Sequence, residues 1–260
     1  MPIRVTRSVI PSLFTTMNLF CGFFAIVKVA QPQPDYQMAV WLIILAGIFD
    51  GLDGAMARLT NSSSEFGVEL DSLADVVSFG TAPAFIIYTA FFHRWETAGV
   101  VIAALPAMCG ALRLARFNVQ LVGFDKNYFT GLPIPSGALV LISYLYFFHL
   151  PVDSIVPENL KPALMTIITL GVSLLMISTI RYDTLPKLSA AGIKAAPLKS
   201  IGFLIGVVVA IVTKGAGIFP FMAVYLIYGI IRQSIAMFRN TDEDEDEDTL
   251  EESEPSPFDV

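Results

Sequence analysis

Long apolar segments recur along most of this chain, and they constrain its fold more than any other feature. A helix that crosses a bilayer needs about 20 mostly apolar residues, because lipid offers no partner to unpaired backbone groups. Only 15% of the 260 residues are charged, whereas soluble domains carry about 25%. We therefore predict an all-α, polytopic integral membrane protein with about eight transmembrane helices, at residues 9–30, 37–58, 67–92, 96–117, 134–150, 163–180, 200–214 and 216–237.

The acids are distributed unevenly, and this distribution divides the chain. The formal net charge is −7, but residues 241–260 contain 11 of the 23 acids and no base. Like charges repel and nothing apolar can collapse in such a run, so we predict a disordered acidic cytosolic tail at 241–260. Residues 1–240 are expected to form one membrane-embedded domain, and nucleic acid is not an expected partner.

The basic residues favour one orientation in the membrane. If the N-terminus lies in the cytosol, 12 of the 16 Lys and Arg residues fall on the cytosolic side, in agreement with the positive-inside rule. Both termini are then cytosolic. We expect a protein of the bacterial inner membrane whose active site faces the cytosol.

Four aspartates interrupt the apolar pattern where the second and third predicted helices meet: Asp50, Asp53, Asp71 and Asp75. Residues three or four positions apart share a helix face, so an antiparallel hairpin brings both pairs together near the cytosolic interface. Four carboxylates this close repel one another unless protons or cations lie between them. Hard oxygen ligands suit Mg²⁺, Mn²⁺ or Ca²⁺, and we predict that the four aspartates bind two divalent cations.

Small residues and one arginine accompany the aspartates: Gly54, Ala57, Arg58 and Gly67. Glycine and alanine let a bulky ligand approach the helix backbone, although the same residues also allow close helix packing. Two metals, an arginine and an open backbone at the cytosolic interface suit a pyrophosphate, whose oxygens the metals can bridge.

Together, these residues resemble the signature of the CDP-alcohol phosphatidyltransferase family. The pattern is Asp-x-x-Asp-Gly-x-x-Ala-Arg, eight residues, then Gly-x-x-x-Asp-x-x-x-Asp, and every position matches. Further stretches are similar to the membrane-embedded phosphatidylserine synthase branch of that family. They include "PSLFTTMNLFCGF" at 11–23, "ALRLARFN" at 111–118 and "FTGLPIPSGA" at 129–138.

The resemblance implies a reaction in which CDP-diacylglycerol and L-serine give phosphatidylserine and CMP. It implies that Asp50, Asp53 and Asp71 bind metal and that Asp75 shares the second ion and acts as general base. The CDP-diacylglycerol site would contain Asp53 and the four residues Gly54, Ala57, Arg58 and Gly67. Family members are commonly homodimers, so the resemblance implies a homodimer as well.

Recognition of serine is inferred from the residues themselves. A carboxylate near a membrane favours arginine, which binds it bidentately. Arg113 and Arg116 are three positions apart near the cytosolic end of the fourth predicted helix, Asn118 follows, and Arg181 is a second candidate. Membrane anchoring by positive charge is the alternative for the arginines. Thr15 and Asn18 in the first predicted helix can contact the nucleotide or form bonds between helices.

Three rival functions remain open. Another enzyme of the same family would use glycerol 3-phosphate or inositol as the alcohol, and the shared motif does not separate these. A cation transporter would place its acids near the bilayer midplane, in broken helices of corresponding halves. An intramembrane aspartyl protease needs only two aspartates, and leaves the other two and Arg58 without a role.

Overall fold

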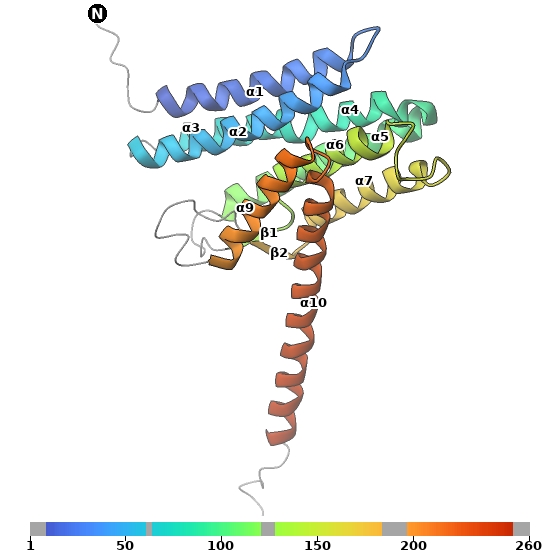
Figure 1. The fold of residues 1–260 in the computed structure, drawn as a ribbon. Helices are drawn as coiled ribbons and strands as arrows, with labels where there is room; N and C mark the ends of the chain where they lie inside the picture. The colour runs from blue at the N-terminus through green and yellow to red at the C-terminus, as the bar shows by residue number, and fades with distance from the viewer. Residues whose placement is uncertain (1–8, 61–63, 121–127, 184–196, 252–260) are drawn as a thin grey trace, which may run out of the picture.

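The computed structural model of this chain describes residues 9–60, 64–120, 128–183 and 197–251, and these residues are mostly helical (Figure 1). The helices are α1 (Val9–Val29), α2 (Tyr36–Thr60), α3 (Glu65–Asp75), α4 (Ala82–Ala90), α5 (Glu96–Gln120), α6 (Ile134–Tyr144), α7 (Lys161–Ile177), α9 (Pro197–Val212) and α10 (Ile218–Glu251). Two π-helical turns, η1 (Val76–Thr81) and η3 (Leu145–His149), and one 3-10 turn, η2 (Phe92–Trp95), join some of them. All eight predicted apolar segments are therefore helical.

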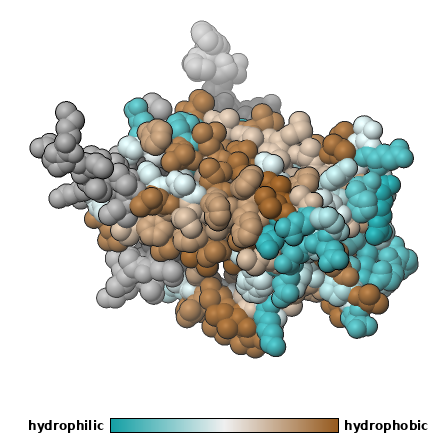
Figure 2. All heavy atoms as spheres, turned by 90° about the horizontal axis from the view of Figure 1, so that it is seen from above, coloured by the Kyte–Doolittle hydropathy of each residue, from teal (hydrophilic) through white to brown (hydrophobic). Residues whose placement is uncertain are grey.

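Helix length separates these segments into two groups. Among the described residues, five helices are long and apolar enough to cross a membrane: Pro11–Val29, Tyr36–Thr60, Glu65–Ala90, Phe92–Val119 and Ile218–Ile235. Three more are apolar but shorter: Ile134–His149, Lys161–Ile177 and Ser200–Val212. The face of the bundle seen in Figure 2 is largely apolar, with hydrophilic residues gathered along one side. Such a surface suits contact with lipid.

The third of the long helices, formed by α3, η1 and α4, lies at the centre of the bundle. Its apolar stretch is 61% buried, against 11% for that of Ile218–Ile235. The π-helical turn η1 packs closely against α1, where Ser78 Oγ donates to the backbone oxygen of Asn18 at 2.8 Å. A Cβ at Gly22 would lie 2.4 Å from Ser78 Oγ. Glycine at this position therefore allows α1 to approach the central helix.

The all-α fold also contains one short β-ribbon, which the sequence did not predict. β1 (Tyr128–Thr130) pairs antiparallel with β2 (Arg181–Asp183), and Phe129 lies opposite Tyr182. Gly131 turns the chain out of β1 with φ of +78°, a backbone conformation that favours glycine. Strands of three residues are too short to produce an alternating sequence pattern, so hydropathy could not reveal them.

The last helix extends beyond the predicted eighth span. Figure 1 shows α10 passing β2, running across the other helices and projecting beyond the bundle. It is helical to Glu251, and the disordered tail at 241–260 stays a prediction. Extending an existing helix needs no new nucleus, and glutamate is a good helix former. Residues 252–260 lie outside the described part of the chain.

Candidate active site

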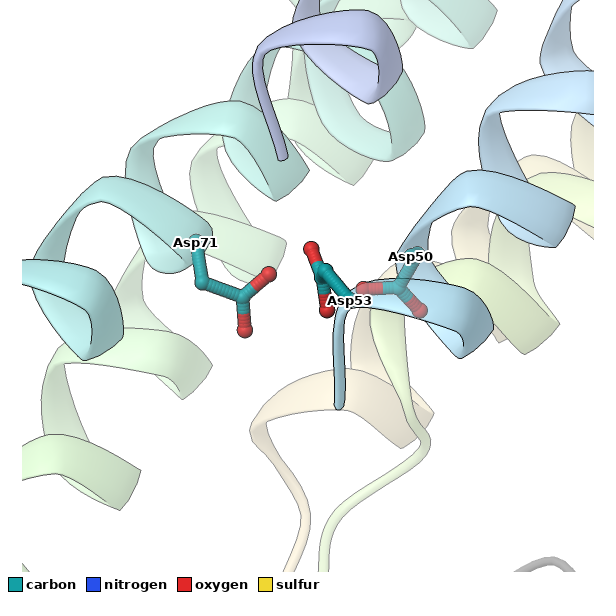
Figure 3. A group of neighbouring side chains, drawn as sticks. All are labelled: Asp50, Asp53 and Asp71. Atoms are coloured by element: carbon teal, nitrogen blue, oxygen red, sulfur yellow. The ribbon is translucent and has the colours of Figure 1, made fainter. Parts of the chain in front are cut away.

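Three of the four predicted aspartates meet between α2 and α3. Asp50 and Asp53 come from α2 and Asp71 comes from α3, and their carboxylates point toward one another (Figure 3). One oxygen from each lies within 4.8 Å of the other two. The cluster forms because the antiparallel α2 and α3 each present an acid-bearing face to the other, as the spacing of the aspartates predicts.

Asp75 lies one helical turn beyond Asp71, at the inner edge of this cluster. Its side chain is only 7% exposed, and its carboxyl interacts with that of Asp50. Asn18 on α1 donates from Nδ2 to Asp75 Oδ1 at 3.2 Å. Asp75 is thus held by a neutral donor on one side and faces another carboxylate on the other.

Helix α1 carries no acid, yet it fixes two of the four carboxylates. In addition to the bond from Asn18, Thr15 Oγ1 donates to Asp53 Oδ2 at 2.9 Å. Both donors are buried, and Asn18 is fully so. The sequence left open whether these two side chains contact a nucleotide or bond between helices. In the structure they bond between helices, directly to the acidic site.

The site residues fit a divalent cation. The ligand atoms are carboxylate oxygens, which suit hard cations. Asp71 Oδ1 and Asn18 Oδ1 are buried, and neither has a hydrogen-bond partner among the described residues. A buried polar atom left unpaired costs about 1–3 kcal/mol, and repulsion between the carboxylates adds to this cost. Cations bound among the aspartates would remove both penalties.

The residues predicted to bind the CDP group lie at the adjoining ends of α2 and α3. The guanidinium of Arg58 lies over Gly54. A Cβ at Gly54 would lie 3.5 Å from Arg58 Nη1. Ala57 is half-buried and Arg58 is exposed. The backbone N–H of Gly67 donates to Ser64 Oγ at 3.0 Å, which caps the start of α3. Residues 61–63 of the connecting turn lie outside the described residues.

The structure separates the two arginines that the sequence placed together. Arg113 is 4% exposed and interacts electrostatically with Asp75 and with Tyr225 of α10. Arg116 is exposed, and its Nη1 donates to the backbone oxygen of Ile177 at 3.1 Å. The carbonyl of Ile177 ends α7, so Arg116 binds a helix C-terminus, where a cation is favoured. Of the two, Arg113 is the one that interacts electrostatically with an aspartate of the acidic site.

The other two candidates for serine binding have different positions. Asn118 Nδ2 donates to Ser72 Oγ at 3.0 Å, next to Asp71 in the sequence. It therefore ties α5 to α3. Arg181 pairs through β2 with Thr130, and its side chain lies outside the described residues.

Sequence reasoning gave no role to Ser78 or Tyr225, because a single polar residue in an apolar helix does not indicate which residue it will contact.

Comparison with known proteins adds an independent finding. The sequence profile of the CDP-alcohol phosphatidyltransferase family matches residues 8–177. A CDP-diacylglycerol–serine O-phosphatidyltransferase of Helicobacter pylori (strain ATCC 700392 / 26695) is 38% identical over 234 residues, which cover 88% of this chain and 92% of the relative. The enzyme of that name from Methanocaldococcus jannaschii is 35% identical, covering 84% and 90%. An archaetidylserine synthase of Methanothermobacter thermautotrophicus is 38% identical, covering 70% and 72%.

Proposed function

Because this chain belongs to the CDP-alcohol phosphatidyltransferase family, we propose that it transfers the phosphatidyl group of CDP-diacylglycerol to the hydroxyl of L-serine. The products are phosphatidylserine and CMP. The observation that carries the proposal is the convergence of Asp50, Asp53 and Asp71 within 4.8 Å, with Asp75 beside them. The names of the relatives in H. pylori and M. jannaschii support serine as the acceptor, over glycerol 3-phosphate or inositol.

Two divalent cations, Mg²⁺ or Mn²⁺ with Ca²⁺ as a further option, belong to this proposal. Asp50, Asp53 and Asp71 would hold them, with Asp75 sharing the second. When bound, such cations offset the charge of a pyrophosphate and of the phosphate that leaves it. The oxygen-only ligand set and the unpaired Asp71 Oδ1 support this assignment.

Asp75 would act as the general base. Serine's hydroxyl is a poor nucleophile at neutral pH and needs a positioned base. As the serine oxygen bonds to the phosphorus that carries diacylglycerol, the hydroxyl proton passes to the Asp75 carboxylate. The bond from that phosphorus to the CMP oxygen breaks, and CMP takes the electron pair. Asn18, which donates to Asp75 Oδ1, keeps the carboxylate oriented for the transfer.

The CDP group would lie over the ends of α2 and α3. Gly54, Ala57 and Gly67 leave room for it beside Asp53, and the guanidinium of Arg58 over Gly54 can bind a phosphate.

The diacylglycerol chains must remain in lipid while CMP and serine exchange with water. We therefore propose that the bundle lies in a bacterial inner membrane, with the acidic site at its cytosolic interface. Eight membrane-spanning segments, two cytosolic termini, and assembly as a homodimer complete this arrangement. The apolar surface of the helices supports it.

An alcohol-incorporation assay tests the proposal. The purified protein receives CDP-diacylglycerol, Mn²⁺ or Mg²⁺, and one radiolabelled alcohol at a time: L-serine, glycerol 3-phosphate or inositol. We expect label in lipid from serine alone, and none with Asp75→Asn. Glu69→Gln is a matched control, because Glu69 is an exposed acid on the same helix. Label entering lipid from glycerol 3-phosphate or inositol instead would assign a different acceptor.

A further inference from the structure

Helix α10 lies outside the part of the chain that matches the family, which ends at residue 177. Tyr225 of α10 nevertheless interacts electrostatically with Arg113, and so does Asp75. We infer that Arg113 and Tyr225 form the subsite for the carboxylate of the acceptor, so that a helix beyond the shared region selects an amino acid as the alcohol. This inference rests on the proposed function and adds the residues that determine its specificity.

The first step of the argument is the size of serine. Its hydroxyl and its carboxylate are carried by adjacent carbons, so a group that binds the carboxylate must lie close to the base that receives the hydroxyl proton. Arg113 interacts electrostatically with Asp75, whereas Arg116 is bound to the end of α7. Arg113 is also 4% exposed. A charge-assisted bond is stronger where water is excluded.

The second step is the placement of Tyr225. Tyr225 and Asp75 both interact electrostatically with the guanidinium of Arg113, which is buried. The ring of Tyr225 lies 5.6 Å from that of Tyr182 on β2, at an interplanar angle of 41°. A phenol beside a guanidinium can donate a second hydrogen bond to the same carboxylate.

The third step is the reason that α10 reaches this position. Gly229 lies one helical turn after Tyr225, and a Cβ there would lie 2.4 Å from Tyr182 Cε1. Glycine thus lets α10 pack directly on the buried ring of Tyr182, which is 1% exposed.

The hydroxyl of Tyr182 offers a further donor. It is buried and has no hydrogen-bond partner among the described residues. Burial raises the pKa of Tyr182 to about 12, so the phenol stays protonated at neutral pH and can donate a hydrogen bond to a ligand.

The two proposed subsites come from different parts of the fold. The groups proposed for the CDP group lie on α2 and α3, whereas Arg113 lies on α5, Tyr225 on α10 and Tyr182 on β2. A substitution at Tyr225 should therefore affect the acceptor and leave the donor unaffected.

The test compares two tyrosines of α10. Tyr225→Phe removes only the phenolic hydroxyl, and Tyr228→Phe is the matched control because Tyr228 is 56% exposed on the same helix. We expect Tyr225→Phe to raise the KM for L-serine about 10-fold, because the variant loses one hydrogen bond to a charged group. The KM for CDP-diacylglycerol and the thermal unfolding temperature should stay unchanged, and Tyr228→Phe should change none of the three.

L-Serine methyl ester provides a second measurement, because it keeps the hydroxyl and the amine but lacks the carboxylate charge. The wild type should prefer serine to the ester, and Arg113→Ala should lose that preference. An unchanged serine KM in Tyr225→Phe, or an equal rise in both KM values, would overturn the inference. The proposed function would survive that result if the wild type makes phosphatidylserine. A wild type that makes none would refute both.

Discussion

Acidic residues are concentrated in two regions of this chain, and the two regions differ in structure. Asp50, Asp53, Asp71 and Asp75 lie in apolar helices, and three of them bring oxygens within 4.8 Å of one another. Residues 241–260 contain 11 acids, seven of them consecutive at 242–248, and the backbone continues as α10 to Glu251. What the structure shows in the first region is the convergence of carboxylates from two helices. Hydrogen bonds from α1 hold two of the four carboxylates in place.

Removal of divalent cations should have the largest effect on activity, because the proposed metal ligands lie in the first of these two regions. EDTA should abolish phosphatidylserine synthesis, because the charge of the leaving phosphate and of the clustered carboxylates would no longer be neutralised. Mg²⁺ or Mn²⁺ should restore it, and Na⁺ should not. Titration with Mn²⁺, followed by electron paramagnetic resonance, should give two tightly bound ions per chain. Full activity in EDTA would show that the aspartates do not bind a required metal.

Asp71→Asn should have the next largest effect. The change removes one charge and keeps the shape, and we expect kcat/KM to fall about 1,000-fold, since a metal ligand contributes several kcal/mol to the transition state. Glu69→Gln on the same helix should retain activity, because that acid is exposed. Turnover of Asp71→Asn at the wild-type rate would contradict the proposed metal-binding role of Asp71.

Asn18→Ala tests the support that α1 gives to the cluster. Loss of the bond to Asp75 Oδ1 should lower kcat about 10-fold, as expected for one hydrogen bond to a charged group. Thr16→Ala is the control, because Thr16 is exposed on the same helix and its hydroxyl donates to the nearby Ser12 carbonyl. Equal kcat values for the two variants would mean that the Asn18 bond does not orient Asp75.

The smallest effect is expected from the tail. Truncation after Asn240 removes all 11 terminal acids, yet kcat/KM should change less than about twofold, because every residue assigned to the site precedes Asn240 and charges in water are screened by salt. Turnover measured at 0.05 M and 0.5 M NaCl checks this. A marked loss of activity at both salt concentrations would give the second acidic region a role in the reaction.

Sequence reasoning identified the helices and the acidic site because both depend on local spacing. Hydropathy located all eight helical segments, since a helix pairs its backbone groups within itself. The spacing of Asp50 with Asp53 and of Asp71 with Asp75 set the faces that meet between α2 and α3. The family resemblance found in the same residues agrees with the family match over residues 8–177.

What the sequence could not supply depends on contacts between distant residues. The ribbon of β1 and β2 joins residues about fifty positions apart, and no periodic pattern marks strands of three residues. Arg113 and Arg116 look equivalent in sequence, but Arg116 binds the end of α7, whereas Arg113 is buried and interacts electrostatically with Asp75.

The amino-acid sequence by itself determined where the chain is apolar, where its helices run and which carboxylates share a helix face. Only the tertiary structure decided that α1 holds Asp53 and Asp75 through Thr15 and Asn18, and that Tyr225 of α10 interacts electrostatically with Arg113. The reason is physical: helix formation depends on neighbours within a few residues, whereas the partner of a polar side chain is chosen by the packing of whole helices.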